Sequence, residues 1–198
     1  MKFKLSVLLI SLFSFSFSQK TVDAKIITIT NDTLQTKVKV TTNMFDPTLI
    51  YGSTFSRKIK IFDQHGNKNN LEVSDIKELY FKDYNEKNRV FINNSIDKKS
   101  LSEQLYVGTI IDWYRMFSAT NGGENINDVL YNKETKKYLG TNYFTGLPKK
   151  KLKEFFGDEP EMIALIEESK GGGFTNLNDV YSSMQTIIKK YESLKAKK

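Results

Sequence analysis

Residues 105–117 read LYVGTIIDWYRMF, and this stretch decides the expected fold because it suits a strand and is apolar on both faces. Counting by twos places aliphatic and aromatic side chains on either side, with Asp112 and Arg115 as the only charges. A strand with one face exposed to solvent would alternate apolar and polar residues instead. The pattern therefore predicts a central strand covered on both sides, or a long bent strand shared between two sheets. Gly108 marks the expected bend or bulge.

Period-two alternation continues on both sides of this stretch, and polar turn residues such as Asn31-Asp32 separate the alternating segments. That is the pattern of antiparallel hairpins. We therefore expect an antiparallel sheet or a partly closed β-barrel over about residues 25–144. The expected strands outside the central stretch are Lys25–Thr30, Leu34–Thr41, Arg57–Phe62, Leu71–Val73, Leu79–Tyr84, Arg89–Asn93, Val129–Tyr131 and Lys137–Phe144.

After Gly146 the apolar residues recur at helical spacing. Pro148 suits the first turn of a helix, and an apolar stripe at i, i+3, i+4 and i+7 runs through residues 177–194. Strands followed by helices indicate the α+β class. We expect a β-rich region over residues 19–146 and two or three helices within residues 147–198, packed on it as a single globular domain.

The N-terminus has the three parts of a secretory signal peptide. Two lysines lie among the first four residues, Leu5–Phe17 is apolar apart from serines, and Ser16-Phe17-Ser18 supplies small residues before Gln19. The apolar run of about 13 residues is shorter than the ~20 that span a bilayer. We predict a signal peptide over residues 1–18 and export to the periplasm or the extracellular space. Because the chain has no cysteine, a lipid-anchored lipoprotein is not expected.

The composition argues against several classes of function. There is no cysteine and only one histidine, which excludes thiolate zinc sites, iron–sulfur clusters and multi-histidine metal sites. Lysine and arginine total 30 against 23 acidic residues, for a net charge of +7, but only three of the 30 are arginines. Nucleic-acid binding favours arginine for bidentate contacts. We therefore expect no cofactor, no metal, no nucleic-acid partner and no transmembrane helix.

Candidate catalytic groups are sparse. His65 lies in a polar turn sequence and no Gly-x-Ser-x-Gly motif provides a nucleophile for it. Asp112 lies among aromatic residues, where burial would raise its pKa, and a hydrolase would need a second carboxylate such as Asp83 or Glu78. The three glycines at 171–173 lack the strand and the lysine of a phosphate loop, which favours a hinge. We assign no catalytic residue.

An interaction surface is the better-supported hypothesis. Aromatic side chains on a sheet bind sugars, peptides or proteins when they are exposed, and a dense basic run follows Pro148. The candidate surface residues are Trp113, Tyr114, Lys149, Lys150, Lys151 and Lys153, and the candidate binding loops are residues 43–56 and 118–127. We expect a non-catalytic envelope protein with a protein or glycan partner. The alternatives are a periplasmic hydrolase using sheet carboxylates and a lipid- or glycan-associated structural component.

Three segments carry a resemblance to a known group of proteins. They are the Phe-Ser-Phe-Ser-Gln sequence at residues 15–19, the Ile-Thr-x-x-Asn-Asp-Thr-Leu-x-x-Lys-Val sequence at residues 27–38, and Ser-Asp-Ile-Lys-Glu-Leu at residues 74–79. The chain resembles small exported β-rich proteins of flavobacterial (Bacteroidetes) type. The resemblance implies a β-rich region followed by a helical region, and it assigns no activity and no site residue.

Overall fold

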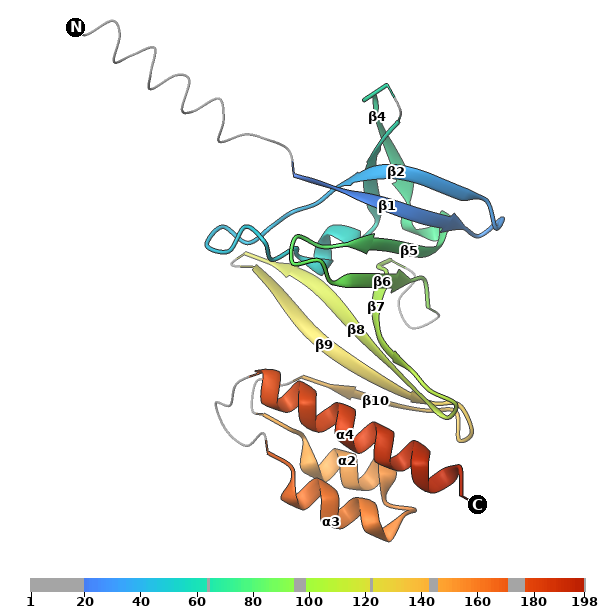
Figure 1. Ribbon diagram of the computed structural model, residues 1–198, viewed down its shortest axis with the longest axis vertical. Coiled ribbons are helices and arrows are strands. Elements are labelled where there is room, and N and C mark those ends of the chain that lie inside the picture. Colours follow the sequence, from blue (N-terminus) through green and yellow to red (C-terminus); the bar gives the residue numbers. More distant parts are fainter. Residues whose placement is uncertain are drawn as a thin grey trace, which may run out of the picture.

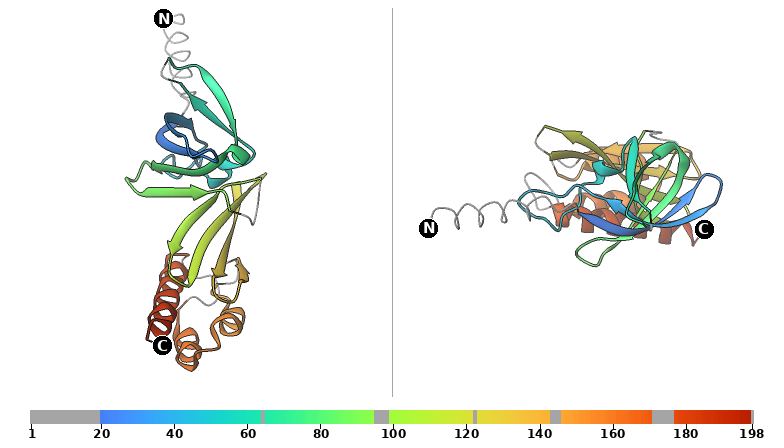
Figure 2. Two further views of the ribbon diagram at one scale, coloured as in Figure 1. Left: turned by 90° about the vertical axis from the view of Figure 1, so that its right-hand side faces the viewer. Right: turned by 90° about the horizontal axis from the view of Figure 1, so that it is seen from above.

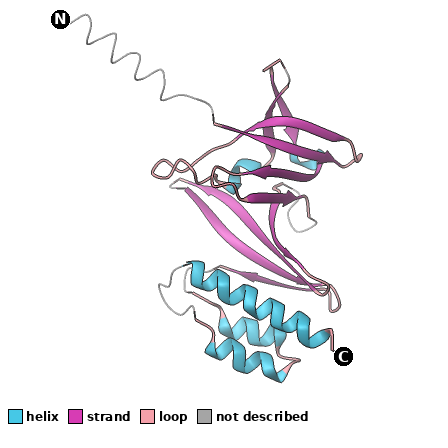
Figure 3. Cartoon of the chain, viewed as in Figure 1, coloured by secondary structure: helices cyan, strands magenta, loops and turns pink. Residues whose placement is uncertain are grey.

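The computed structural model describes residues 20–63, 65–94, 99–121, 123–142, 146–170 and 177–197. Over these residues the chain forms an antiparallel sheet of ten strands, followed by three α-helices (Figures 1 and 3). The strands are β1 (Thr21–Thr28), β2 (Thr33–Lys39), β3 (Lys58–Phe62), β4 (Lys68–Glu72), β5 (Ile76–Lys82), β6 (Asn88–Ile92), β7 (Ser102–Val107), β8 (Ile111–Thr120), β9 (Gly123–Asn132) and β10 (Lys137–Thr141). The helices are α2 (Lys149–Phe156), α3 (Pro160–Glu168) and α4 (Leu177–Lys195), and two 3₁₀ turns are η1 (Gly52–Phe55) and η2 (Val73–Asp75).

The spatial order of the strands is β10-β9-β8-β7-β6-β5-β1-β2-β3-β4, which leaves β10 and β4 as edges. The predicted α+β class and antiparallel sheet are therefore confirmed. The sheet is not closed, so the alternative of a partly closed barrel is wrong. Most neighbours in the sheet are also neighbours in the chain, and tight turns join most of them. The turn at Asn31, with a φ of 65°, is one of these, whereas longer connections join β2 to β3 and β6 to β7.

The prediction of one strand over residues 105–117 is wrong. β7 ends at Val107 and β8 begins at Ile111, and the two pair as a hairpin with Val107 opposite Asp112. Gly108 lies in the turn of this hairpin rather than at a bend within a strand. The stretch looks continuous in the sequence because the turn carries none of the Asn-Gly or Asp-Gly signals that mark a tight hairpin.

A side chain from the last helix stabilises this turn. The backbone N–H groups of Thr109, Ile110 and Ile111 donate to the carboxylate of Glu192 in α4, over 3.2, 2.9 and 2.7 Å. A Cβ on Gly108 would lie 2.2 Å from Oε1 of Glu192, so only glycine lets the carboxylate approach this closely. The turn is thus held by a contact between segments distant in the sequence.

The buried residues form two separate clusters, one at each end of the long axis (Figures 1 and 2). The N-terminal core lies within the curled sheet β1–β6 and η1, and the C-terminal core lies between β8, β9 and the helices. β8 contributes to both cores, through Phe117 to the first and Trp113 to the second. The predicted stripe of the last helix fills the C-terminal core with Val180, Met184, Ile187, Ile188 and Tyr191.

Two predictions lie outside the described residues: the signal peptide at 1–18 and the glycine hinge at 171–173. Within the part of the chain that the structure describes, no helix combines the length and the apolarity that crossing a bilayer requires.

Candidate functional site

The residues between β2 and η1 form a compact loop that projects from the side of the N-terminal half (Figure 1). Oδ1 of Asn43 accepts hydrogen bonds from the N–H groups of Phe45 and Asp46, at 2.7 and 3.0 Å. Oδ1 of Asp46 accepts from the N–H and the hydroxyl of Thr48, at 3.0 and 2.7 Å. The N–H of Asn43 donates to the carbonyl of Leu49 over 2.9 Å. Short side chains and backbone groups thus close the loop on itself.

This loop, residues 43–50, presents apolar side chains to solvent, and we call it the apolar loop. Phe45 is 89% exposed, Met44 is 81% exposed and Leu49 is 48% exposed. Burying each of these side chains against a partner is worth roughly 1.5–3 kcal/mol. Clustered exposed aromatic, methionine and leucine side chains are typical of the centre of a protein interface.

The end of the β8–β9 hairpin lies beside the apolar loop. Residues 118–127 were expected to form a loop, but the strands pair to their ends, with Thr120 opposite Gly123, so that expectation is wrong. The backbone N–H of Ser53, just after the apolar loop, donates to Oε2 of Glu124 in β9 over 2.9 Å. The two segments singled out as binding loops therefore meet, although about 70 residues separate them.

The turn between β5 and β6 and the start of the described chain complete this surface. Nδ2 of Asn85 donates to the hydroxyl of Thr48 over 3.3 Å. Nζ of Lys20 donates to the carbonyl of Pro47 over 2.9 Å and lies 5.8 Å from the ring centre of Tyr84. The apolar loop, the β5–β6 turn and the β8–β9 hairpin end together form what we call the end surface.

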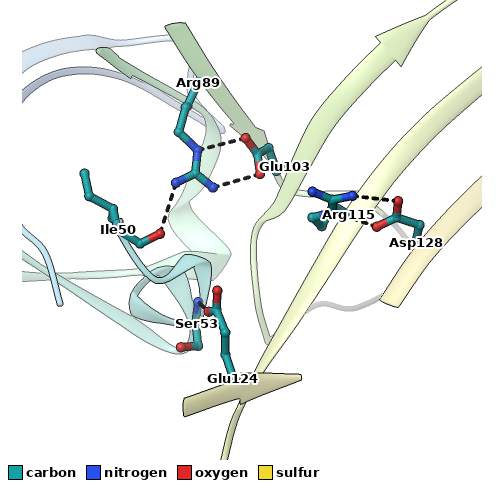
Figure 4. Close-up of polar contacts among 7 residues, drawn as sticks. All are labelled: Ile50, Ser53, Arg89, Glu103, Arg115, Glu124 and Asp128. Atoms are coloured by element: carbon teal, nitrogen blue, oxygen red, sulfur yellow. Dashed lines mark hydrogen bonds and ion pairs between the residues drawn. The ribbon is translucent and has the colours of Figure 1, made fainter. Parts of the chain in front are cut away.

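A buried arginine fixes the base of the apolar loop (Figure 4). Arg89 in β6 donates from Nε and Nη2 to the two carboxylate oxygens of Glu103 in β7, each over 2.8 Å. Its Nη1 donates to the carbonyl of Ile50 over 3.1 Å. Both charged side chains are buried. A bidentate pair of this kind has one stable geometry, so it sets where the apolar loop leaves the sheet.

A second arginine–carboxylate pair extends the row across the sheet (Figure 4). Glu103 lies opposite Arg115 in β8, and Arg115 lies opposite Asp128 in β9. Nε and Nη2 of Arg115 donate to Asp128 over 2.8 and 3.0 Å, and the indole N–H of Trp113 donates to the same carboxylate over 2.9 Å. Alternating charges cancel along this row, so it serves to hold strands together.

Trp113 and Tyr114 do not lie on an exposed surface, contrary to the expectation. Trp113 is 0% exposed, within the C-terminal core, and Tyr114 is 9% exposed on the opposite face of the sheet. The hydrogen bond from the Trp113 indole to Asp128 satisfies its one donor, which allows full burial.

The basic run lies on α2, far from the end surface. Nζ of Lys149 donates to the carbonyl of Glu167 over 2.6 Å, and Lys153 forms an ion pair with the carboxylate of Glu167. Lys150 and Lys151 are exposed. Two of the four lysines therefore link α2 to α3, so the run is not a uniform cationic patch.

The carboxylates considered for a hydrolase do not come together. Asp112 in β8 pairs with Nζ of Lys133 at 2.9 Å and accepts from the hydroxyl of Tyr114 at 3.0 Å. Glu78 is on β5, three strand spacings away, which is roughly 14 Å. A glycosidase pair needs about 5–10 Å. Asp83 accepts hydrogen bonds within the β5–β6 turn, whereas Asp112 lies at the end of β8 next to the β7–β8 turn, away from the β8–β9 hairpin end.

Two carboxylates of the end surface have shifted pKa values of opposite sign. Hydrogen bonds from Thr48 lower the pKa of exposed Asp46 below its usual range. Burial raises the pKa of Glu124, against the hydrogen bonds from Ser53. Asp46 therefore keeps a fixed negative charge beside Phe45 at neutral pH, whereas Glu124 carries a desolvation cost.

Among the described residues, no group of three histidine or acidic side chains is arranged to hold a metal ion. No family model, no curated protein and no solved structure matches this chain. The candidate site therefore rests on the geometry described above.

The sequence did not single out Arg89 or Glu103. The signal that points to Arg89 is the rarity of arginine: a chain with 30 basic residues has only three arginines, and two of them form bidentate pairs with a buried carboxylate. Lysine cannot make that contact, so an arginine in a lysine-rich chain marks a place where the planar group is required.

Proposed function

We propose that the protein is exported to the bacterial envelope and acts there as a non-catalytic binding protein, with the end surface docking onto a partner protein. The observation that carries this proposal is the pair Met44 and Phe45, 81% and 89% exposed on a loop that is closed by its own hydrogen bonds. A pre-formed loop loses little entropy on binding, so more of the apolar burial becomes affinity.

The charge of Asp46 favours a protein over a lipid surface as the partner. This residue lies directly after Phe45, and its lowered pKa keeps it ionised. A fixed carboxylate next to the apolar tip opposes insertion into a bilayer. It suits an apolar pocket with a cationic rim on another protein.

The test is capture from envelope extract with three forms of the mature protein: wild type, Phe45→Ser and Ile163→Ser. Ile163 is 42% exposed on α3 and provides a matched loss of an exposed apolar side chain away from the end surface. A central apolar anchor contributes about 2 kcal/mol or more, a loss of about 30-fold in affinity. We expect Phe45→Ser to lose one dominant, stoichiometric partner that Ile163→Ser retains.

Equal capture by both variants would place the interface elsewhere. Turnover of a glycan or ester substrate without a stable partner would contradict a non-catalytic role. Intact mass of the protein purified from its native envelope tests export separately, and we expect a chain that begins near Gln19.

A further inference from the structure

The face of β7–β10 that points away from the C-terminal core carries a row of tyrosines. Trp113 and Leu130 face the core, so the residues that alternate with them face outward. Asp112, Tyr131 and Tyr138 are cross-strand neighbours in β8, β9 and β10. The rings of Tyr131 and Tyr138 stack with centres 4.5 Å apart, and Tyr138, on the edge strand, is 53% exposed.

Polar groups lie beside the stacked rings. The hydroxyl of Tyr114 donates to Asp112 over 3.0 Å, and Nζ of Lys133 pairs with the same carboxylate at 2.9 Å. Burial, the charge of Asp112 and its hydrogen bond raise the pKa of Tyr114, so its hydroxyl remains a donor. The charges of Asp112 and Lys133 cancel, and the pair lies beside the hydroxyl of Tyr114.

Gly140 adjoins Tyr138 on the same face of β10, and nothing in the fold requires a glycine there. Its φ is not positive, so the backbone conformation suits any residue. A Cβ at this position would meet no heavy atom within 4 Å, so packing does not exclude a side chain. Glycine weakens a strand, and it lies here in the short edge strand. A glycine inside a strand marks a bulge, a tight bend, or the close approach of a ligand or another backbone. The unbroken register between β10 and β9 leaves the close approach as the reading for Gly140.

We propose that this edge of the sheet is a saccharide-binding site: a sugar ring lies over Gly140 against the exposed Tyr138 ring. The C–H face of a pyranose packs on the electron-rich face of an aromatic ring. Its hydroxyls need donors and acceptors nearby, which the Tyr131 and Tyr138 hydroxyls provide. The balanced charge of Asp112 and Lys133 selects a neutral saccharide over a polyanionic one.

An added strand from a peptide or a second copy is the competing occupant of an edge strand. Strand addition uses the N–H and C=O groups along the edge and side-chain pockets on alternate positions. It does not require a missing side chain on the aromatic face. The observations at Gly140 and Tyr138 therefore favour a sugar.

The test is titration of the mature protein with neutral oligosaccharides, namely chitotetraose, cellopentaose, maltoheptaose and mannopentaose, with dextran sulfate as the anionic comparison. Binding is followed by NMR shifts of the β9 and β10 amides. We expect at least one neutral probe to bind with a dissociation constant of about 1 mM or tighter. We expect Gly140→Val and Tyr138→Ala each to weaken that binding at least about tenfold.

Gly140→Val separates a ligand site from a structural role, because valine favours a strand and should leave the melting temperature unchanged or raise it. Gly140→Ala provides a milder step in the same direction, and Ile163→Ser, on α3, should bind sugar like the wild type. The proposal is overturned if no neutral probe binds, if binding survives Gly140→Val, or if only dextran sulfate binds. It is also overturned if Gly140→Val changes only self-association in sedimentation, which would identify a second copy as the occupant. None of these outcomes bears on the end surface, which Phe45→Ser tests.

Discussion

The two cores of this molecule are built in different ways. In the N-terminal core, most strands pair with a strand next to them in the chain, and the one pair between strands distant in the chain, β1–β5, also lies here. In the C-terminal core, the sheet is covered by helices that follow it, and Glu192 stabilises a turn at residues 108–110. One end is therefore built from paired strands, and the other from helices docked on paired strands.

This difference has a consequence for folding and stability. Local hairpins can form before the rest of the chain is ordered, whereas helix docking requires the sheet and the helices at once. We expect the C-terminal core to be the more sensitive of the two to a single change that blocks docking. β8 links the cores, since Phe117 lies in one and Trp113 in the other.

The largest expected effect comes from Ile187→Asp in α4. Ile187 is fully buried in the C-terminal core. An unpaired carboxylate there costs more than about 4 kcal/mol, enough to detach the helices or unfold the chain. Lys189→Asp is the matched control, because Lys189 is exposed two residues away. Circular dichroism during thermal unfolding measures both variants.

The way in which the Ile187→Asp variant unfolds shows whether the two cores unfold together or separately. If the N-terminal core is sustained by its own hairpins, strand signal from β1–β6 persists in amide exchange after the helical signal is lost. Simultaneous loss of both signals would make the two cores one cooperative unit. A variant as stable as wild type would show that the apolar stripe of α4 does not support the fold.

The sequence predicts features that depend on neighbouring residues better than features that depend on contacts between distant residues. The hairpin at Asn31 and the strands around it follow from alternation and turn residues that are adjacent in the chain. The stripe of α4 follows from helical spacing, and that helix is confirmed. The turn at Gly108 was not predicted, because its stabilising partner, Glu192, is distant in the sequence. The apolar pattern of residues 105–117 continues across the turn without interruption.

The candidate site was predicted in part. Residues 43–56 contain the apolar loop, since Pro47 and Gly52 interrupt any regular element there. The side-by-side arrangement of this loop and Glu124 was not predictable, because it depends on how β8 and β9 pass the N-terminal core. Trp113 is buried although the sequence suggests a surface residue, because an aromatic residue on a strand gives the same sequence pattern whether a helix or solvent covers it.

Glu192→Ala is expected to have the next largest effect. Its carboxylate accepts three hydrogen bonds from the turn, at 2.7–3.2 Å. Removing it leaves backbone donors without that acceptor, at a cost of about 1–3 kcal/mol. Ser193→Ala, at an exposed position of the same helix, is the control. Urea unfolding measures the difference, and equal stability of both variants would mean that water replaces the carboxylate without loss.

The smallest expected effect is a pH dependence of the free energy of unfolding, which has opposite signs at the two ends of the molecule. Burial raises the pKa of Glu124, so its contribution to stability is present below pH 4.5 and is lost as the pH rises through the raised pKa. The ion pair with Lys190 lowers the pKa of exposed Glu161, so its contribution is present above pH 4.5 and is lost as the pH falls. Glu124→Gln and Glu161→Gln each remove one titration while keeping the shape of the side chain. Measured from pH 3.5 to 7, the free energy of unfolding of wild type minus Glu124→Gln should fall with rising pH, and the same difference for Glu161→Gln should rise.

Because Glu161 is exposed, screening keeps its slope shallow, and added salt should flatten it further. Glu124 lies against Ser53 at the base of the apolar loop, so its slope should survive salt. A rising curve for Glu124 would mean that the hydrogen bond from Ser53 outweighs burial, and the end surface would then be held by that charge at neutral pH.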